Sequence, residues 1–305
     1  MVMLQRRSLW AGLAVYGAAL ALTALTYPVL EASGGPGGPP LLWGTWVPIA
    51  VGLLLTWFAA RRAPQQELEK RLDDVLDGHP LGRELVWLMG ALVAFLAGVG
   101  AMAFVFGQIH ADYFVLAVPV ARLLFLFVVP VLLVDRAGFS MEGSSTGMPR
   151  LAMGVTEPWR WVGMLPVAGC LLALVLGTGE RLTPVPDGVA LGVFVALVVI
   201  SVPEEIFFRG MVQTRLERLT DRWSGIVLTS LLFAATYALI GGYAELPRAM
   251  PTGGQHDLGL SIATYGVSGL LYGYVWACYR NMWLNILLRG GVITLVVAPS
   301  LQIVG

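Results

Sequence analysis

Charged residues are scarce in this chain of 305 residues. Only 12% of the residues are Asp, Glu, Lys or Arg, and 57% are hydrophobic, whereas soluble domains carry about 25% charged and about 45–50% apolar residues. Too few charged residues are present to cover a surface that faces water. We therefore expect an integral membrane protein. The nineteen basic residues are balanced by nineteen acidic ones, which argues against a nucleic-acid partner.

Cysteine and histidine are also scarce. The two cysteines, Cys170 and Cys278, lie in apolar runs, where a free thiol usually packs as a small hydrophobe. Two cysteines are too few for a disulfide framework or a cysteine-rich zinc site. The three histidines, His79, His110 and His256, lie in expected loops or at the ends of apolar runs.

Apolar runs dominate what is present. A bilayer core about 30 Å thick needs about 20 helical residues, and lipid offers no hydrogen bonds to an open sheet. We therefore predict an all-α, polytopic transmembrane helical bundle of eight or nine spans. The candidate runs are 9–30, 41–60, 85–107, 113–134, 161–177, 189–202, 226–240, 258–279 and 282–304.

The runs fall into two groups. Residues 1–150 form a four-span N-terminal membrane region with cytoplasmic loops, and residues 151–305 form the C-terminal membrane core. A flexible loop is expected at 140–149 between them. Leucines at helical spacing within 64–84 indicate a short surface helix, with a solvated connector as the alternative. Gly269 and Gly273 are typical of close helix packing.

The basic residues are distributed unequally between the two sides of the bundle. With nine spans and a cytoplasmic N-terminus, fifteen of the nineteen lie on the cytoplasmic side. Arg181 and Arg248 lie on the other side, and Arg122 and Arg289 fall within apolar runs. This is the positive-inside pattern, so we expect a plasma membrane of the bacterial type with the N-terminus in the cytoplasm.

One stretch combines acidic residues with an apolar span: ISVPEEIFFRG, with Glu204, Glu205 and Arg209. Charges inside a span are costly and usually functional. Glu205 and Arg209 have the spacing of a helical ion pair, while Glu204 points about 100° away from Glu205 and needs another partner. The alternative is that these residues mark the cytoplasmic end of a span, where their charged groups reach water.

The string PEEIFFRG resembles the EExxxR motif of the CPBP family of intramembrane proteases, which includes the CAAX prenyl endopeptidases and bacteriocin-processing proteins. The stretch SLLFAATYAL, with Phe233, is similar to the FxxxH motif of that family, and LLYGYVWACYRNMWLNILLRGGVI is similar to its third region. The likeness extends from about Trp161 to the C-terminus and implies a CPBP-like helical core.

The resemblance also implies roles. The first glutamate of the family motif activates water, the arginine braces the helix that bears it, and two later histidines hold a divalent metal, usually zinc. Glu204, Glu205, Arg209 and Phe233 match these motifs, but Tyr237 and Arg289 replace the histidines, and Ile293 stands where Asn is common. An arginine repels a divalent cation and stays protonated, so we expect no metal and no cofactor, although zinc is expected of the family.

Two hypotheses follow for the substituted site. In the first, the Arg289 guanidinium takes the place of the metal and donates hydrogen bonds to Glu204, which closes the former active site as an ionic latch. In the second, Arg289 and Tyr237 donate hydrogen bonds to an oxyanion while Glu204 acts as the base.

Arg122 lies midway along an apolar run, between Pro119 and Pro130. It either lines the cavity around Glu204 or pairs with a backbone carbonyl that a proline kink exposes. We favour the carbonyl.

By resemblance, the chain is an intramembrane endopeptidase, a hydrolase that cleaves prenylated or membrane-bound peptides. The alternative is a catalytically inactive relative, a pseudoenzyme that serves as a membrane binding, immunity or scaffold protein for a protein partner. A transporter is a third class, but no repeated halves are visible.

Overall fold

The computed structural model describes residues 2–26, 41–110, 113, 116–133, 147–178, 195–240 and 258–297. All secondary-structure elements in these residues are helices. Segments labelled η are π-helical, with wider turns than an α-helix. Up to residue 178, the helices are α1 (Val2–Thr26), η1 (Leu42–Trp46), α2 (Val47–Ala60), α3 (Gln65–Leu76), α4 (Leu81–Ile109), α5 (Ala117–Leu123), η3 (Leu124–Val128), α6 (Val129–Leu133), α7 (Met148–Met153), α8 (Pro158–Trp161) and α9 (Met164–Thr178).

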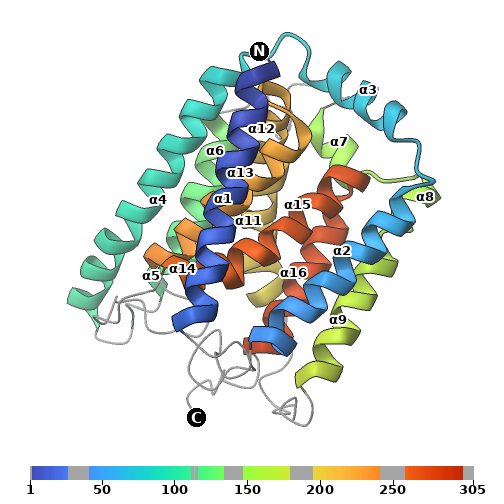
Figure 1. The fold of residues 1–305 in the computed structure, drawn as a ribbon. Coiled ribbons are helices and arrows are strands. Elements are labelled where there is room, and N and C mark those ends of the chain that lie inside the picture. The colour runs from blue at the N-terminus through green and yellow to red at the C-terminus, as the bar shows by residue number, and fades with distance from the viewer. Residues whose placement is uncertain are drawn as a thin grey trace.

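The later helices build the C-terminal part of the bundle (Figure 1). They are η6 (Val195–Ser201), α11 (Val202–Glu205), η7 (Ile206–Gln213), α12 (Thr214–Leu219), α13 (Arg222–Ile240), α14 (Leu258–Ser261), η9 (Ile262–Gly266), α15 (Val267–Tyr279) and α16 (Met282–Val297). The predicted loop at 140–149 lies mostly outside the described residues, which resume at Gly147 and enter α7 at once.

Several helices have the length and composition of membrane spans. Among the described residues, five are long and apolar enough: Leu42–Ala60, Leu81–Ile109, Pro158–Gly177, Arg222–Ile240 and Leu258–Tyr279. Three shorter apolar helices accompany them: Leu9–Leu25, Ala117–Leu132 and Met282–Leu295. The run predicted at 189–202 is described from residue 195 onward, where it begins the helix that carries the charged motif. The all-α polytopic class is thus confirmed.

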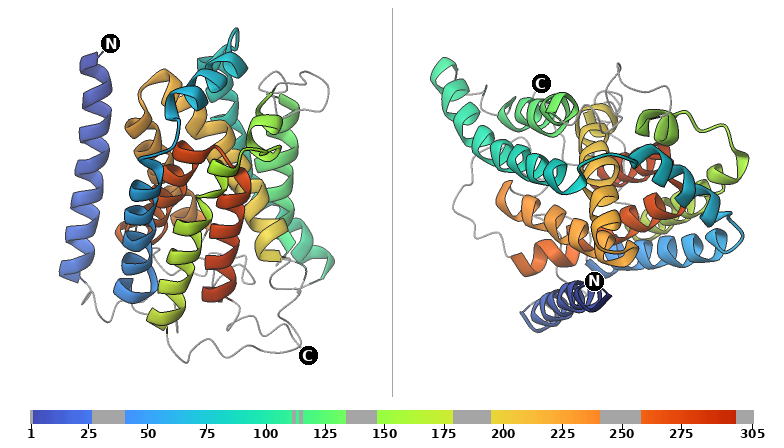
Figure 2. Two further views of the ribbon diagram at one scale, coloured as in Figure 1. Left: turned by 90° about the vertical axis from the view of Figure 1, so that its right-hand side faces the viewer. Right: turned by 90° about the horizontal axis from the view of Figure 1, so that it is seen from above.

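Helices from the two predicted regions pack directly against one another. Helix α2 lies along α9 and α15, and α1 lies along α13 at the edge of the bundle (Figure 2). The Tyr16 hydroxyl donates a hydrogen bond to Ser230 Oγ at 2.7 Å, and the Trp46 indole donates to the Ala263 carbonyl at 2.9 Å. Helix α7 also crosses the boundary predicted at residue 150. The division into two regions stays a prediction, and their helices share one bundle.

Two glycines of α15 permit close helix packing, as their spacing predicts. A Cβ atom added at Gly269 would lie 3.0 Å from Ser230 Cβ on α13, and one at Gly273 would lie 2.9 Å from Gln213 Oε1 on η7. Helix α15 therefore packs tightly against α13, which carries Phe233 and Tyr237, and against η7, which carries Arg209.

The surface helix predicted within 64–84 is present as α3. Its leucines Leu68, Leu72 and Leu76 are buried at intervals of four residues, while most of its other side chains are exposed. Its apolar stripe packs on the bundle, and its polar face is solvated. The helix lies at the end of the bundle where α2 ends and α4 begins (Figure 1).

Candidate functional site

The sequence-predicted site residues meet inside the bundle, although four separate parts of the chain supply them. Glu204 and Glu205 lie on α11, Arg209 on the adjoining η7, Phe233 and Tyr237 on α13, and Arg289 on α16. Arg122 comes from α5 in the N-terminal region. All seven side chains are buried, with relative exposures of 0 or 1%. We call this group, together with Asn285 described below, the ionic cluster.

Glu204 is held by three donors. Arg289 Nη2 contacts its Oε2 atom, and Arg122 Nε donates to its Oε1 atom at 2.6 Å. The Tyr237 hydroxyl lies 3.0 Å from Oε1 and 2.9 Å from Oε2. Both carboxylate oxygens are therefore engaged by two guanidinium groups and a phenol.

Glu205 shares Arg289 with Glu204 and has two further partners. Arg289 Nη1 donates to its Oε1 atom at 3.0 Å, and Asn285 Nδ2 donates to its Oε2 atom at 3.0 Å. Arg209 Nε lies 3.4 Å from Oε2 and forms the helical ion pair predicted from the sequence. Helical geometry gives the two adjacent glutamates different further partners, but the expectation that they share no neighbour is wrong, because the two terminal nitrogens of Arg289 reach both carboxylates.

Arg289 joins the two halves of the cluster. One terminal nitrogen contacts Glu204 and the other contacts Glu205, and Nη2 also donates to the Tyr237 hydroxyl at 2.6 Å. The planar guanidinium group has several donors in fixed directions. The predicted contact between Glu204 and Arg289 is therefore present, and it includes Glu205 as well.

The ring of Phe233 lies close to two of the arginines. The guanidinium carbon of Arg289 lies 4.4 Å from the centre of its ring, and that of Arg209 lies 5.0 Å from it. Arg209 also lies 5.5 Å from the ring centre of Tyr272. Aromatic faces attract cations by electrostatics, so these rings compensate part of the lost hydration of two buried charges.

Arg122 faces the cluster. Its Nε atom forms a buried ion pair with Glu204, so this contact supports the interpretation of Arg122 as a polar lining residue over the pairing with a carbonyl that we favoured. Through Arg122, the N-terminal region contributes directly to a group otherwise built by residues 204–289.

Sequence reasoning missed Asn285. Besides Glu205, its side-chain amide donates to the Tyr272 carbonyl at 2.9 Å, so it links α16 to α11 and α15. Its position four residues before Arg289 places both side chains on one face of α16. A polar Asn four residues before Arg289 in an otherwise apolar helix was the feature of the sequence that could have indicated this contact.

The side chains at this site do not suit the binding of a divalent metal. Two carboxylates and one phenol face three guanidinium groups, and the arginines would repel the ion. A catalytic zinc normally takes three nitrogen, oxygen or sulfur ligands and a water. Within the described residues, no group of three or more His, Cys, Asp or Glu side chains is placed to hold a metal. Of the histidines, His79 contacts Glu84 and His110 ends α4, whereas His256 lies outside the described residues.

Comparison with protein families supports the resemblance found in the sequence. Residues 186–294, a little over a third of the chain, match the model of the family described as type II CAAX prenyl endopeptidase Rce1-like. This segment is Rce1-like. It includes α11, η7, α13 and most of α16, and hence every residue of the ionic cluster except Arg122. Comparison with curated proteins and with solved structures found no match. The chain is thus an integral membrane protein with a CAAX-protease-type segment.

Proposed function

We propose that this chain is a non-proteolytic, metal-independent relative of the CAAX-type intramembrane proteases, which binds a membrane-bound protein or lipidated peptide. The proposal rests on the contacts that Glu204 makes with its neighbours. In a hydrolase this carboxylate needs access to a water molecule, but here both oxygens are engaged by Arg122, Arg289 and Tyr237.

The cost of opening the cluster supports the same conclusion. Separating a buried ion pair leaves an uncompensated charge and costs about 3–5 kcal/mol. To act as a base, Glu204 would have to leave two guanidinium groups. Among the described residues, no set of ligands is placed to hold a metal that would lower the pKa of a bound water. The ion pairs therefore favour a structural role for the former catalytic residues.

A metal-free hydrolase is the rival candidate, because Tyr237 and Arg289 are the donors that an oxyanion would need. However, both donors contact Glu204, and they also contact each other at 2.6 Å. Donors that stabilise an oxyanion must point at the substrate oxygen and not at the base. Their orientation thus supports the non-proteolytic alternative.

Metal analysis and a peptidase assay on the purified full chain test the proposal. The protein is exposed to zinc, freed of unbound metal and analysed for bound zinc, and it is then incubated with a prenylated CAAX peptide. We expect less than stoichiometric zinc and no cleavage. Cleavage that Glu204→Gln abolishes, but that the matched surface variant Glu67→Gln retains, would overturn the proposal. So would one tightly bound zinc per chain that depends on Glu204.

A further inference from the structure

A row of buried polar side chains continues from the ionic cluster along one helical segment. Glu205, Arg209, Gln213 and Glu217 follow one another at intervals of four residues on α11, η7 and α12. All four are buried, with relative exposures between 0 and 9%. Side chains at this spacing lie on nearly the same face of a helix. The row, which we call the polar row, therefore leads from the cluster towards the end of the bundle predicted to be cytoplasmic.

Direct contacts join two pairs of side chains within the polar row. Glu205 Oε2 lies 3.4 Å from Arg209 Nε, and Gln213 Nε2 donates a hydrogen bond to Glu217 Oε1 at 2.7 Å. Gln213 Nε2 also donates to the Gly273 carbonyl on α15 at 2.8 Å. No hydrogen bond joins the side chains of Arg209 and Gln213 to each other. The row is therefore made of an inner pair and an outer pair with a gap between them.

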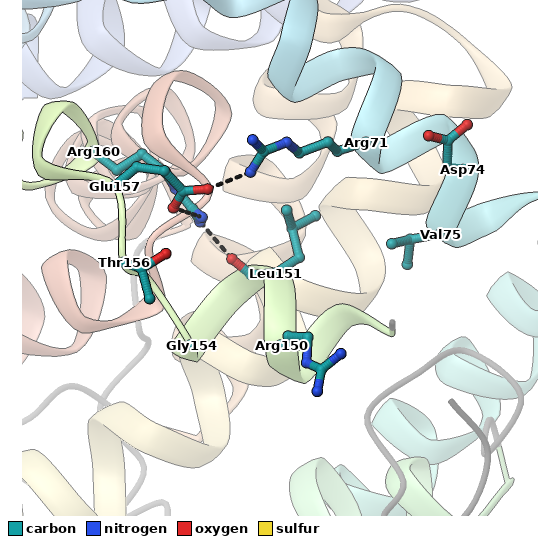
Figure 3. A pocket seen from close by; sticks show the side chains of 9 residues that line it. All are labelled: Arg71, Asp74, Val75, Arg150, Leu151, Gly154, Thr156, Glu157 and Arg160. Atoms are coloured by element: carbon teal, nitrogen blue, oxygen red, sulfur yellow. Dashed lines mark hydrogen bonds and ion pairs between the residues drawn. The ribbon is translucent and has the colours of Figure 1, made fainter. Parts of the chain in front are cut away.

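The outer end of the polar row meets solvent. Arg280 Nη2 contacts Glu217 Oε2 and lies 3.6 Å from Glu69 Oε1 on α3, and the side chain of Glu69 is 34% exposed. A cavity of about 480 Å³ opens beside this end, between α3 and the segment that joins α7 to α8 (Figure 3). Arg160 lines the cavity and donates to the Arg280 carbonyl at 2.5 Å. Water therefore has access to the surroundings of Arg280.

Buried polar atoms without a hydrogen-bond partner occur at three levels of this route. In the part of the chain that the structure describes, no group bonds to Arg209 Nη1 and Nη2, to Gln213 Oε1, or to Arg280 Nε and Nη1. Asn285 Oδ1, on the inner side, is in the same condition. An unsatisfied buried polar group costs about 1–3 kcal/mol, and buried water commonly satisfies such groups with about three hydrogen bonds per molecule. The route therefore suits water.

Two aromatic rings of α15 face the polar row at different depths. The guanidinium carbon of Arg209 lies 5.5 Å from the ring centre of Tyr272, and that of Arg280 lies 5.5 Å from the ring centre of Trp276. Both rings are buried, with relative exposures of 0 or 1%. Tyr272 therefore marks the inner part of the row, and Trp276 marks the part nearer the cytoplasmic end.

We propose that the polar row is an access path for water, which enters at the cytoplasmic end, passes between α12 and α15 and reaches Arg209 and Glu205. Water both donates and accepts hydrogen bonds, as the guanidinium donors and the Gln213 acceptor require. Ionisable residues that face the interior of a membrane protein commonly mark such pathways. The path ends at Glu205, whereas Glu204 is engaged by other partners, so this inference is independent of the function proposed above.

Radiolytic hydroxyl-radical labelling of the full chain in detergent, read by mass spectrometry, tests the path, because a buried ring is oxidised only where water lies beside it. After correction for intrinsic reactivity, we expect Tyr272 and Trp276 to be oxidised about fivefold more than Phe95. Phe95 is equally buried but lies on α4, outside the row. After rapid mixing into water labelled with ¹⁸O, the heavy isotope should appear in both oxidised rings. Oxidation of Tyr272 with unlabelled oxygen alone would indicate trapped water and overturn the path.

Substitutions of Gln213 separate the inner part of the path from the outer part. Gln213→Leu places an apolar group midway, so oxidation of Tyr272 should fall about fivefold while that of Trp276 is retained. Gln213→Asn keeps an amide and should retain oxidation of both rings. The matched control is Gln66→Leu, which replaces an exposed glutamine on α3 and should change neither ring. Oxidation of Tyr272 no greater than that of Phe95 in the unmodified chain, or an equal fall at both rings in Gln213→Leu, would overturn the proposal.

Discussion

At the scale of single residues, Arg289 takes the place that the CPBP resemblance gives to a metal-binding histidine. A divalent cation would offer two positive charges to the carboxylates, whereas Arg289 offers one charge and several directed hydrogen bonds. Arg122 supplies a second cation to Glu204, and Arg209 supplies one to Glu205. The charge of the two glutamates is therefore balanced by Arg289, at the histidine position, together with Arg122 and Arg209.

Removing Arg289 is expected to destabilise the protein strongly. Arg289→Met leaves both glutamates with fewer cations inside the bundle, and the free energy of unfolding in detergent should fall by about 3–5 kcal/mol. Arg62→Met, which removes an exposed arginine, should change it by less than about 0.5 kcal/mol. Adding Glu204→Gln to Arg289→Met should recover part of the loss, because it removes one uncompensated charge. Equal effects of Arg289→Met and Arg62→Met would show that the ion pairs carry no net stability.

At the scale of helices, the cluster depends on the relative positions of α11, α13 and α16. Tyr237 and Arg289 both reach Glu204, although 52 residues separate them. These helices bring side chains from the two family histidine positions to one carboxylate. The packing of α11, α13 and α16 therefore brings the two positions at which the resemblance implies histidines to the same carboxylate.

Restoring the histidines should create a metal site. The double variant Tyr237→His with Arg289→His gives Glu204 two imidazole neighbours, and three such ligands suffice for zinc. We expect about one zinc per chain by elemental analysis, and loss of this zinc when Glu204→Gln is added. The matched control replaces Tyr274, which stacks on Trp223 away from the cluster, and pairs Tyr274→His with Arg289→His. A folded Tyr237→His and Arg289→His variant that binds no more zinc than this control would contradict the prediction.

The attachment of α3 to the bundle should depend on pH. Burial disfavours the charged form of Glu157, but the hydrogen bond from Arg71 and the charge of Arg160 outweigh it and hold the pKa of Glu157 below its ordinary value of 4.5. Because the pKa is lower in the folded state, ionised Glu157 stabilises this contact above pH 4.5, and the contribution is lost as the pH falls through the folded-state pKa. We expect pepsin to cleave α3 faster as the pH falls below about 4.5.

The substitution Glu157→Gln is the control for this pH dependence. It removes the titrating group, so cleavage of α3 should be fast at every pH at which pepsin acts and should lose its dependence on this carboxyl group. An unchanged pH profile in the variant would assign the effect to other groups.

At the scale of the whole molecule, physical arguments from the sequence predicted the helical class, and together with the family resemblance, which singled out Arg289, they predicted the main ion pair. Apolar runs of sufficient length require helices in lipid, and the cost of a buried carboxylate required a partner for Glu204. The partners of Arg122 and Asn285 depend on how far α5 and α16 are shifted and rotated against α11. A single sequence predicts that an apolar helix forms, but not its rotation. The interpretation of Arg122 therefore favoured a backbone carbonyl over Glu204, and the contact of Asn285 was missed.

The packing between the two predicted regions implies that they fold together. Helix α2 lies along α9, α1 lies along α13, and Arg122 from the N-terminal region completes the partners of Glu204. Residues 147–305 expressed alone would expose the apolar faces of α9 and α13 that α2 and α1 cover, and would lose one cation of the cluster.

We therefore expect residues 147–305 to aggregate after extraction in detergent, and to elute as one monodisperse complex when residues 1–146 are expressed with them as a separate chain. Size-exclusion chromatography distinguishes the two results. In the split protein, Arg122→Met should reduce recovery of the complex, because Glu204 then keeps only Arg289 as a cation. Arg62→Met, also in the first fragment, is the matched control and should leave recovery unchanged. A monodisperse, folded 147–305 fragment would instead mean that the Rce1-like part is an independent domain and that Arg122 is dispensable to it.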